Sequence, residues 1–104
     1  MSKEKCIRKL KELDNLNKKI NGKIKGKKKR EVKGTIEDEV SHLIGENKYV
    51  IQKIKLKSGD PGFRIGYYTC DAKYTKLYYG GYSPIIKSSD FSILLNKARK
   101  KGWL

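Results

Sequence analysis

The chain has little of several residue types on which common functional sites depend. Its 104 residues include only two cysteines, far apart at Cys6 and Cys70, and one histidine. A structural zinc site needs four such ligands, and a disulfide framework needs more cysteines, so neither is expected and both thiols are expected to be reduced. The chain also lacks an apolar run near the roughly 18 residues of a membrane span and an apolar N-terminal leader. We therefore expect a cytoplasmic protein with no membrane span, no metal and no cofactor.

Acidic residues are scarce as well. The chain has 11 acidic and 26 basic residues, for a net charge of +15, and residues 1–34 alone carry +10. Such an excess attracts polyphosphates over long range, and nucleic acid is the abundant cytosolic candidate. Only four of the basic residues are arginines. Because arginine reads guanine edges whereas lysine acts as a point charge on phosphate, we expect weak sequence preference.

The first third of the chain is predicted to form a helix and a basic linker. Ile7, Leu10, Leu13, Leu16 and Ile20 have the three-to-four spacing of one apolar stripe, which predicts a helix over residues 2–21. The lysine-rich run of residues 23–33 has no periodicity that could bury a face, and is interpreted as a linker. Its lysines are expected to contact phosphates, although a solvated tail is the alternative. Residues 1–34 are therefore predicted as an appendage to a compact domain of residues 35–104.

The compact domain is predicted to be α+β. Apolar residues at helical spacing before Gly45 predict a short helix over 36–44. Period-two alternation and turn residues predict four antiparallel strands in a meander, at 49–57, 63–70, 74–79 and 82–87. Capping residues at 88–90 and a stop at Gly102 predict a last helix, with Trp103 and Leu104 packed back on the core.

The candidate binding surface combines aromatic and basic residues on these strands. All seven tyrosines fall on predicted strands, where rings beside cations can stack on bases, although tyrosine also favours strands for packing alone. Phe63 and Ile65 are expected to point inward with Tyr67, which leaves Tyr68, Tyr74 and Tyr78 for the exposed face. The predicted nucleic-acid-binding residues are Lys27, Lys28, Lys29, Arg30, Lys53, Lys55, Arg64, Tyr68, Tyr74, Lys76 and Tyr78.

No catalytic constellation is visible, so a non-enzymatic protein is expected. His42 has no second histidine as a partner, and Glu37, Asp38 and Glu39 are interpreted as charges in the first turn of a helix. Asp60 with Asp71-x-Lys73 is a weak hint of a metal-dependent nuclease. Two further alternatives are a metal-independent ribonuclease and a small regulator of a nucleic-acid enzyme that docks its N-terminal helix into a protein groove.

Residues 48–102 resemble a known group of proteins. The similarity is carried by Gly62-Phe63-Arg64-Ile65, by Pro84-Ile85-Ile86, and by Ser88-Ser89-Asp90-Phe91 with Leu94-Leu95. In this order they resemble one repeat of the group that includes Pur-alpha, Whirly and positive cofactor four proteins. The resemblance implies four antiparallel strands before a helix, a homodimer, and single-stranded DNA or RNA bound on the concave sheet face. It also implies a binding role for Arg64, Tyr68 and Tyr78.

Overall fold

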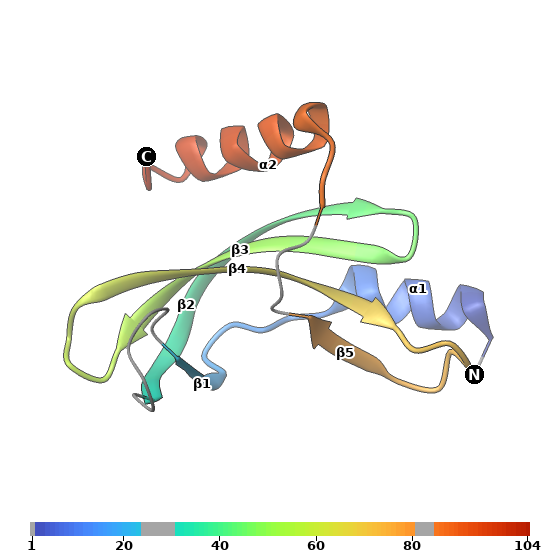
Figure 1. The fold of residues 1–104 in the computed structure, drawn as a ribbon, viewed down its shortest axis with the longest axis horizontal. Coiled ribbons are helices and arrows are strands. Elements are labelled where there is room, and N and C mark those ends of the chain that lie inside the picture. The colour runs from blue at the N-terminus through green and yellow to red at the C-terminus, as the bar shows by residue number, and fades with distance from the viewer. Residues whose placement is uncertain (1, 24–30, 81–84) are drawn as a thin grey trace.

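The computed structural model describes residues 2–23, 31–80 and 85–104, and it has an α+β architecture (Figure 1). Five antiparallel strands form one sheet in chain order, with one helix before the strands and one after them. The elements are α1 (Lys3–Glu12), β1 (Lys19–Lys23), β2 (Glu31–Ile44), β3 (Asn47–Leu56), β4 (Pro61–Cys70), β5 (Leu77–Gly80) and α2 (Ser88–Lys100). No helix among the described residues is long and apolar enough to span a membrane.

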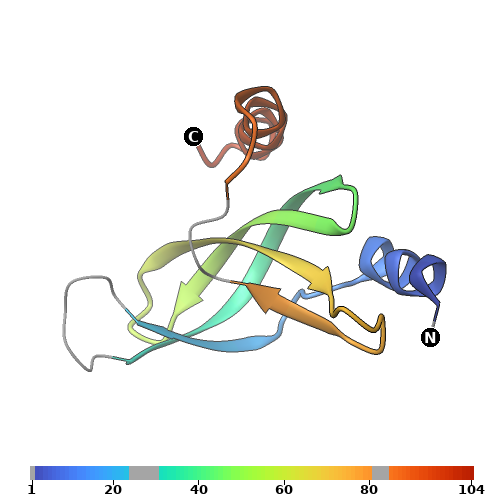
Figure 2. The same ribbon diagram turned by 45° about the vertical axis from the view of Figure 1, so that its right-hand side comes forward.

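The sheet is curled, and its two faces carry different elements. The edge strands β1 and β5 bend away from α2, which lies across the outer side of β2 and β3 (Figures 1 and 2). We call the side facing α2 the outer face and the opposite side, against which α1 packs, the inner face. Successive side chains in a strand point to opposite faces, so the strand register assigns each residue to one of them. On β3, Ile51 and Lys53 belong to the outer face, whereas Val50, Gln52 and Ile54 belong to the inner face.

A small apolar cluster attaches α2 to the outer face. Val40 and Ile51, which are directly opposite each other on β2 and β3, are buried against Leu94 and Ala98 of α2. Polar contacts flank the cluster. The imidazole Nε2 of His42 lies 3.0 Å from the Asp90 carboxylate, and the ammonium groups of Lys97 and Lys101 contact the Ser41 carbonyl and the Asp38 carboxylate. The helical spacing of Leu94 and Ala98 therefore places both residues on the side of α2 that packs against the sheet.

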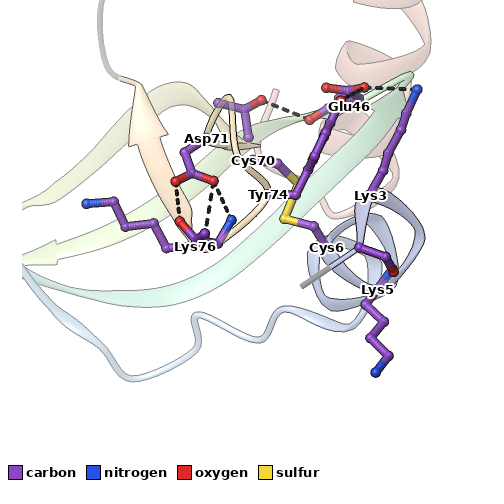
Figure 3. Close-up of a disulfide and its surroundings, with 11 residues drawn as sticks. Lys3, Lys5, Cys6, Glu46, Cys70, Asp71, Tyr74 and Lys76 are labelled. Carbon is purple, nitrogen blue, oxygen red and sulfur yellow. Dashed lines mark hydrogen bonds and ion pairs between the residues drawn. A yellow bond between two sulfur atoms is a disulfide. The ribbon is translucent and has the colours of Figure 1, made fainter.

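A disulfide and several polar contacts attach α1 to the sheet (Figure 3). Ser2 caps the helix by accepting a hydrogen bond from the Lys5 amide, and Cys6 and Leu10 are completely buried. Cys6 forms a disulfide with Cys70 at the end of β4, with a Cα–Cα distance of 6.3 Å. The expectation of two reduced thiols is therefore wrong. The strand order brings together two cysteines that are 64 residues apart, a proximity that no local pattern reveals.

An exposed ion pair lies beside this disulfide. The Glu46 carboxylate accepts a hydrogen bond from the Tyr74 hydroxyl at 2.9 Å and pairs with the Lys3 ammonium at 3.1 Å. These two contacts lower the pKa of Glu46. The same carboxylate raises the pKa of both Lys3 and Tyr74. The first turn of α1 thereby contacts the β2–β3 turn.

The predicted helix over residues 36–44 is wrong, because these residues belong to β2. Ile36 and Val40 are compatible with helical spacing, but both are buried in the sheet, on opposite faces. A register shift between Ile36 and Asp38 makes this possible, since Glu37 is an extra residue that changes the alternation. Because the alternation is irregular, the sequence pattern did not indicate a strand here, although β2 pairs with β1 on one side and β3 on the other.

The predicted helix over residues 2–21 is correct only as far as Glu12. Leu13 leaves the helical conformation with φ −60° and ψ 122°, Asn17 has a positive φ of 66°, and the chain then enters β1. Lys19–Lys23 pairs with Glu31–Thr35, so the expected division after residue 34 falls inside β2, and both α1 and β1 pack with the sheet. Residues 24–30, the centre of the predicted linker, lie outside the described residues.

The sequence predicted a meander of four strands, whereas the sheet has five. The strands expected at 49–57 and 63–70 correspond to β3 and β4, but the expected strand 74–79 is reduced to Leu77–Gly80. Tyr74 lies in the preceding turn with a positive φ of 55°. Residues 85–87 of the expected last strand are not in a strand, and residues 82–84 lie outside the described part. Trp103 packs back as expected, whereas Leu104 is 69% exposed.

Candidate nucleic-acid interface

Four lysines surround a hollow at the end of the sheet where β1, β2 and β3 meet. The hollow has a volume of about 610 Å³, and we call it the lysine hollow. It is lined by Lys19, Ile20, Lys33, Gly34, Thr35, Lys55, Leu56 and Lys57. The lining therefore combines four lysines with residues of adjacent strands, and none of the described residues that line it is a carboxylate.

Strand register brings these lysines together from three segments of the chain. Lys19 and Lys55 are the partners of Thr35 on its two sides, so all three residues share the outer face. Lys57 donates its backbone N–H to the Lys33 carbonyl at 2.8 Å, which places these two residues side by side. Gly34 allows the close approach of β2 to β3, because a Cβ there would lie 2.5 Å from Cγ2 of Ile54. The cations are thus clustered by backbone pairing.

The four lysines have no ion-pair partner among the described side chains. The ion pairs found there join Lys3 with Glu46, His42 with Asp90, and Lys101 with Asp38. Like charges that face each other on adjacent strands destabilise a sheet. A bound polyanion would relieve that repulsion, so the charge pattern favours phosphate binding at the hollow.

An exposed aromatic ring lies on the same face, next along the sheet. Lys53 follows Lys55 on the outer face and is directly opposite Phe63 of β4. Phe63 is 51% exposed, and its ring centroid lies 5.7 Å from that of Trp103. The expectation that Phe63 and Ile65 point into a core is wrong, because α2 covers β2 and β3 and leaves both residues of β4 half-exposed.

Arg64 and Tyr68 come together on the inner face, within a hydrogen-bonded network. Arg64 Nε donates to Gln52 Oε1 at 2.7 Å, and Gln52 Nε2 donates to Glu39 at 2.6 Å and to the Tyr68 hydroxyl at 3.1 Å. The Arg64 guanidinium lies 4.0 Å from the centroid of the Tyr79 ring. Burial raises the pKa of the Tyr79 hydroxyl, and the nearby guanidinium opposes this shift.

The other predicted residues do not join one surface. Tyr74 and Lys76 lie in the β4–β5 turn, where the Lys76 amide donates to Asp71. Tyr78 is 47% exposed but pairs with Thr69, so it lies on the face opposite Tyr68. The expectation that Tyr68, Tyr74 and Tyr78 share one exposed face is therefore wrong. Lys27, Lys28, Lys29 and Arg30 lie outside the described residues.

Sequence reasoning missed three of the four lysines in the hollow. Lys19 fell in a predicted helix and Lys33 in a predicted linker, so neither was assigned to a sheet. Lys57 alternates with Lys53 and Lys55, which was the one available signal. The weak hint of a metal-dependent nuclease has no support from the geometry. Asp60 and Asp71 lie at opposite ends of the ten-residue strand β4, too far apart to share a metal ion.

Comparisons of the chain with protein-family models, with curated proteins and with solved structures found no match. The resemblance to the Pur-alpha, Whirly and positive cofactor four group therefore stays a prediction.

Proposed function

We propose that this chain is a non-enzymatic nucleic-acid-binding protein that binds single-stranded DNA or RNA with weak sequence preference. The observation that carries the proposal is the lysine hollow, where Lys19, Lys33 and Lys55 of three adjacent strands and Lys57 of the turn after β3 gather, with no carboxylate among the described lining residues. Lysine ammonium groups bind phosphate as point charges, which supports binding through the backbone of the strand rather than through its base edges. The net charge of +15 acts in the same direction over longer range.

The outer face offers a path for a single strand beyond the hollow. Residues two apart on a strand are about 6.6 Å apart, so Lys55 and Lys53 form a row of cations on one side of β3, and Lys57 lies in the turn that follows. This row leads to the exposed ring of Phe63. Phosphates would follow the lysines while a base stacks on the ring, which is the combination used by proteins that bind single strands without reading sequence.

The alternative of a docked N-terminal helix has less support. The stripe expected to enter a partner's groove is largely used inside this chain, since Leu10 is fully buried and Ile20 belongs to β1. A homodimer and a cytoplasmic location both stay predictions. The buried disulfide is more usual in proteins of oxidising compartments than in cytosolic ones.

Charge removal at the hollow should weaken binding and flatten its salt dependence. We expect the double variant Lys55→Gln/Lys57→Gln to lower affinity for a single-stranded oligonucleotide. The slope of log affinity against log salt should also fall by about 1.4, since each phosphate contact contributes about 0.7. Fluorescence polarisation across a salt series measures both quantities.

The matched control is Lys9→Gln/Lys11→Gln on α1, which removes the same charge from two exposed positions away from the hollow. Equal losses in both double variants would show that binding depends on net charge alone and would reject the hollow as the interface. Binding by the original protein that does not respond to salt would reject the proposed function itself.

Loss of the aromatic ring should reduce the preference for single strands. We expect Phe63→Leu, which keeps an apolar side chain against Trp103, to weaken single-strand binding by about 1–3 kcal/mol and duplex binding much less. Ile65→Ala is the control, because Ile65 lies on the same face of β4 with 54% exposure and has no ring. Competition between single-stranded and duplex DNA measures the preference, and an unchanged ratio in Phe63→Leu would exclude stacking at this position.

A further inference from the structure

The inner face contains Arg64, whose side chain is held in place at Nε while its two terminal nitrogens make no hydrogen bond to described residues. Gln52 is fully buried and lies between Glu39 and Arg64, with its amide oxygen toward Arg64 and its amide nitrogen toward Glu39. Because Gln52 lies between them, the Arg64 guanidinium forms no ion pair with the Glu39 carboxylate. Its Nε is the atom that is held, and the ring of Tyr79 supports its flat side.

The two terminal nitrogens of this guanidinium make no hydrogen bond within the described part of the chain. Arg64 is only half-buried, so these donors remain reachable from solvent. Fixing Nε and the ring contact removes much of the side-chain freedom that an arginine loses when it binds an anion. The Nη1 and Nη2 atoms therefore form a pre-oriented fork of the kind that binds phosphate with two parallel hydrogen bonds.

Tyr68 supplies a third donor, because its hydroxyl contacts the same Gln52 amide that holds Arg64. Its hydroxyl oxygen already accepts a hydrogen bond from Gln52 Nε2, so its own hydrogen is free to donate elsewhere. The Glu39 carboxylate is occupied by hydrogen bonds from Gln52 and from the Asn15 amide at 3.0 Å. The acceptor atoms that contact Gln52 therefore already accept hydrogen bonds within this network. The donor hydrogens that remain unused belong to Arg64 and Tyr68.

We infer that the inner face holds a binding site for a phosphate monoester, with Arg64 Nη1, Nη2 and the Tyr68 hydroxyl as its donors. Three donors match the three terminal oxygens of a monoester, whereas a backbone phosphodiester has only two. The phosphate has two possible sources, a free nucleotide or the terminal phosphate of a nucleic-acid strand. The site lies on the face of the sheet opposite to the lysine hollow, so it does not depend on the proposed function.

Calorimetric titration with adenosine 5′-monophosphate at low salt tests the site, with adenosine as the ligand that lacks phosphate. We expect the monophosphate to bind and adenosine not to bind. Arg64→Lys keeps the charge but loses the fork, and should weaken binding roughly tenfold or more. Arg8→Gln, which removes one positive charge at an exposed position of α1, should leave binding unchanged.

Tyr68→Phe provides a second test in case changes at Arg64 disturb folding. It removes only the hydroxyl, and we expect a weaker but measurable loss of monophosphate binding with the thermal unfolding midpoint little changed. A 5′-phosphorylated oligonucleotide compared with its unphosphorylated form distinguishes the two sources. A gain in affinity from the 5′-phosphate that is lost in Arg64→Lys assigns the site to strand ends, and monophosphate binding without such a gain assigns it to nucleotides. Equal binding of adenosine and its monophosphate, or full affinity in Arg64→Lys and Tyr68→Phe, would overturn the inference.

Discussion

Reduction of the Cys6–Cys70 disulfide is expected to lower the free energy of unfolding by about 4 kcal/mol. The bond closes a loop with a sequence separation of 64 residues, and a cross-link of that length removes much of the entropy of the unfolded chain. Small domains have a total stability of only about 5–15 kcal/mol, so this loss would remove a large part of it. Urea denaturation with and without dithiothreitol measures the difference in a single sequence.

The variant Cys6→Ala/Cys70→Ala provides the control for this experiment. It should resemble the reduced protein in its urea midpoint and should not respond to dithiothreitol. Because Lys48 donates to the Leu13 carbonyl and Lys3 pairs with Glu46, we expect α1 to stay docked, less firmly, when the cross-link is absent. Two freely alkylated thiols in the folded, unreduced protein would contradict the disulfide, and equal midpoints with and without reductant would contradict its contribution to stability.

Gly66→Ala is expected to destabilise the protein by about 1–3 kcal/mol, the usual cost of forcing extra volume into a packed site. Gly66 lies on the inner face of β4, and the hydroxyl and ring of Tyr79 from β5 cover it so closely that a methyl group would overlap them. Relief would require Tyr79 to move, and its ring supports the Arg64 guanidinium. The variant should therefore lose stability and disturb the inner-face network together.

Gly62→Ala is the matched comparison on the same strand and the same face. A methyl group at Gly62 would meet only the Leu56 side chain at 3.4–3.5 Å, which is ordinary van der Waals contact. We expect this variant to be neutral or slightly stabilising, since alanine loses less backbone entropy than glycine on folding. Thermal unfolding of both variants measures the contrast, and equal midpoints would contradict the tight packing of Tyr79 over Gly66.

The elements predicted correctly are those in which one local period continues without interruption. In the second half of β3, Lys53 and Lys55 lie on the outer face and alternate with Ile54 and Leu56. In α2, Leu94 and Ala98 share the side that meets the sheet. Strand β2 was missed because an extra residue at Glu37 interrupts the alternation. A broken period of two over Ile36, Val40 and Ile44 cannot be distinguished from a helical period by spacing alone.

The amino-acid sequence by itself determined the excess of positive charge, the α+β class and most of the segments that alternate or repeat at helical spacing. These properties are local, since each depends on residues within a few positions of one another. Tertiary structure alone decided that Lys19, Lys33, Lys55 and Lys57 surround one hollow, that Gln52 orients Arg64, and that Cys6 meets Cys70. These associations depend on strand register, because a shift of one residue moves every side chain of a strand to the other face.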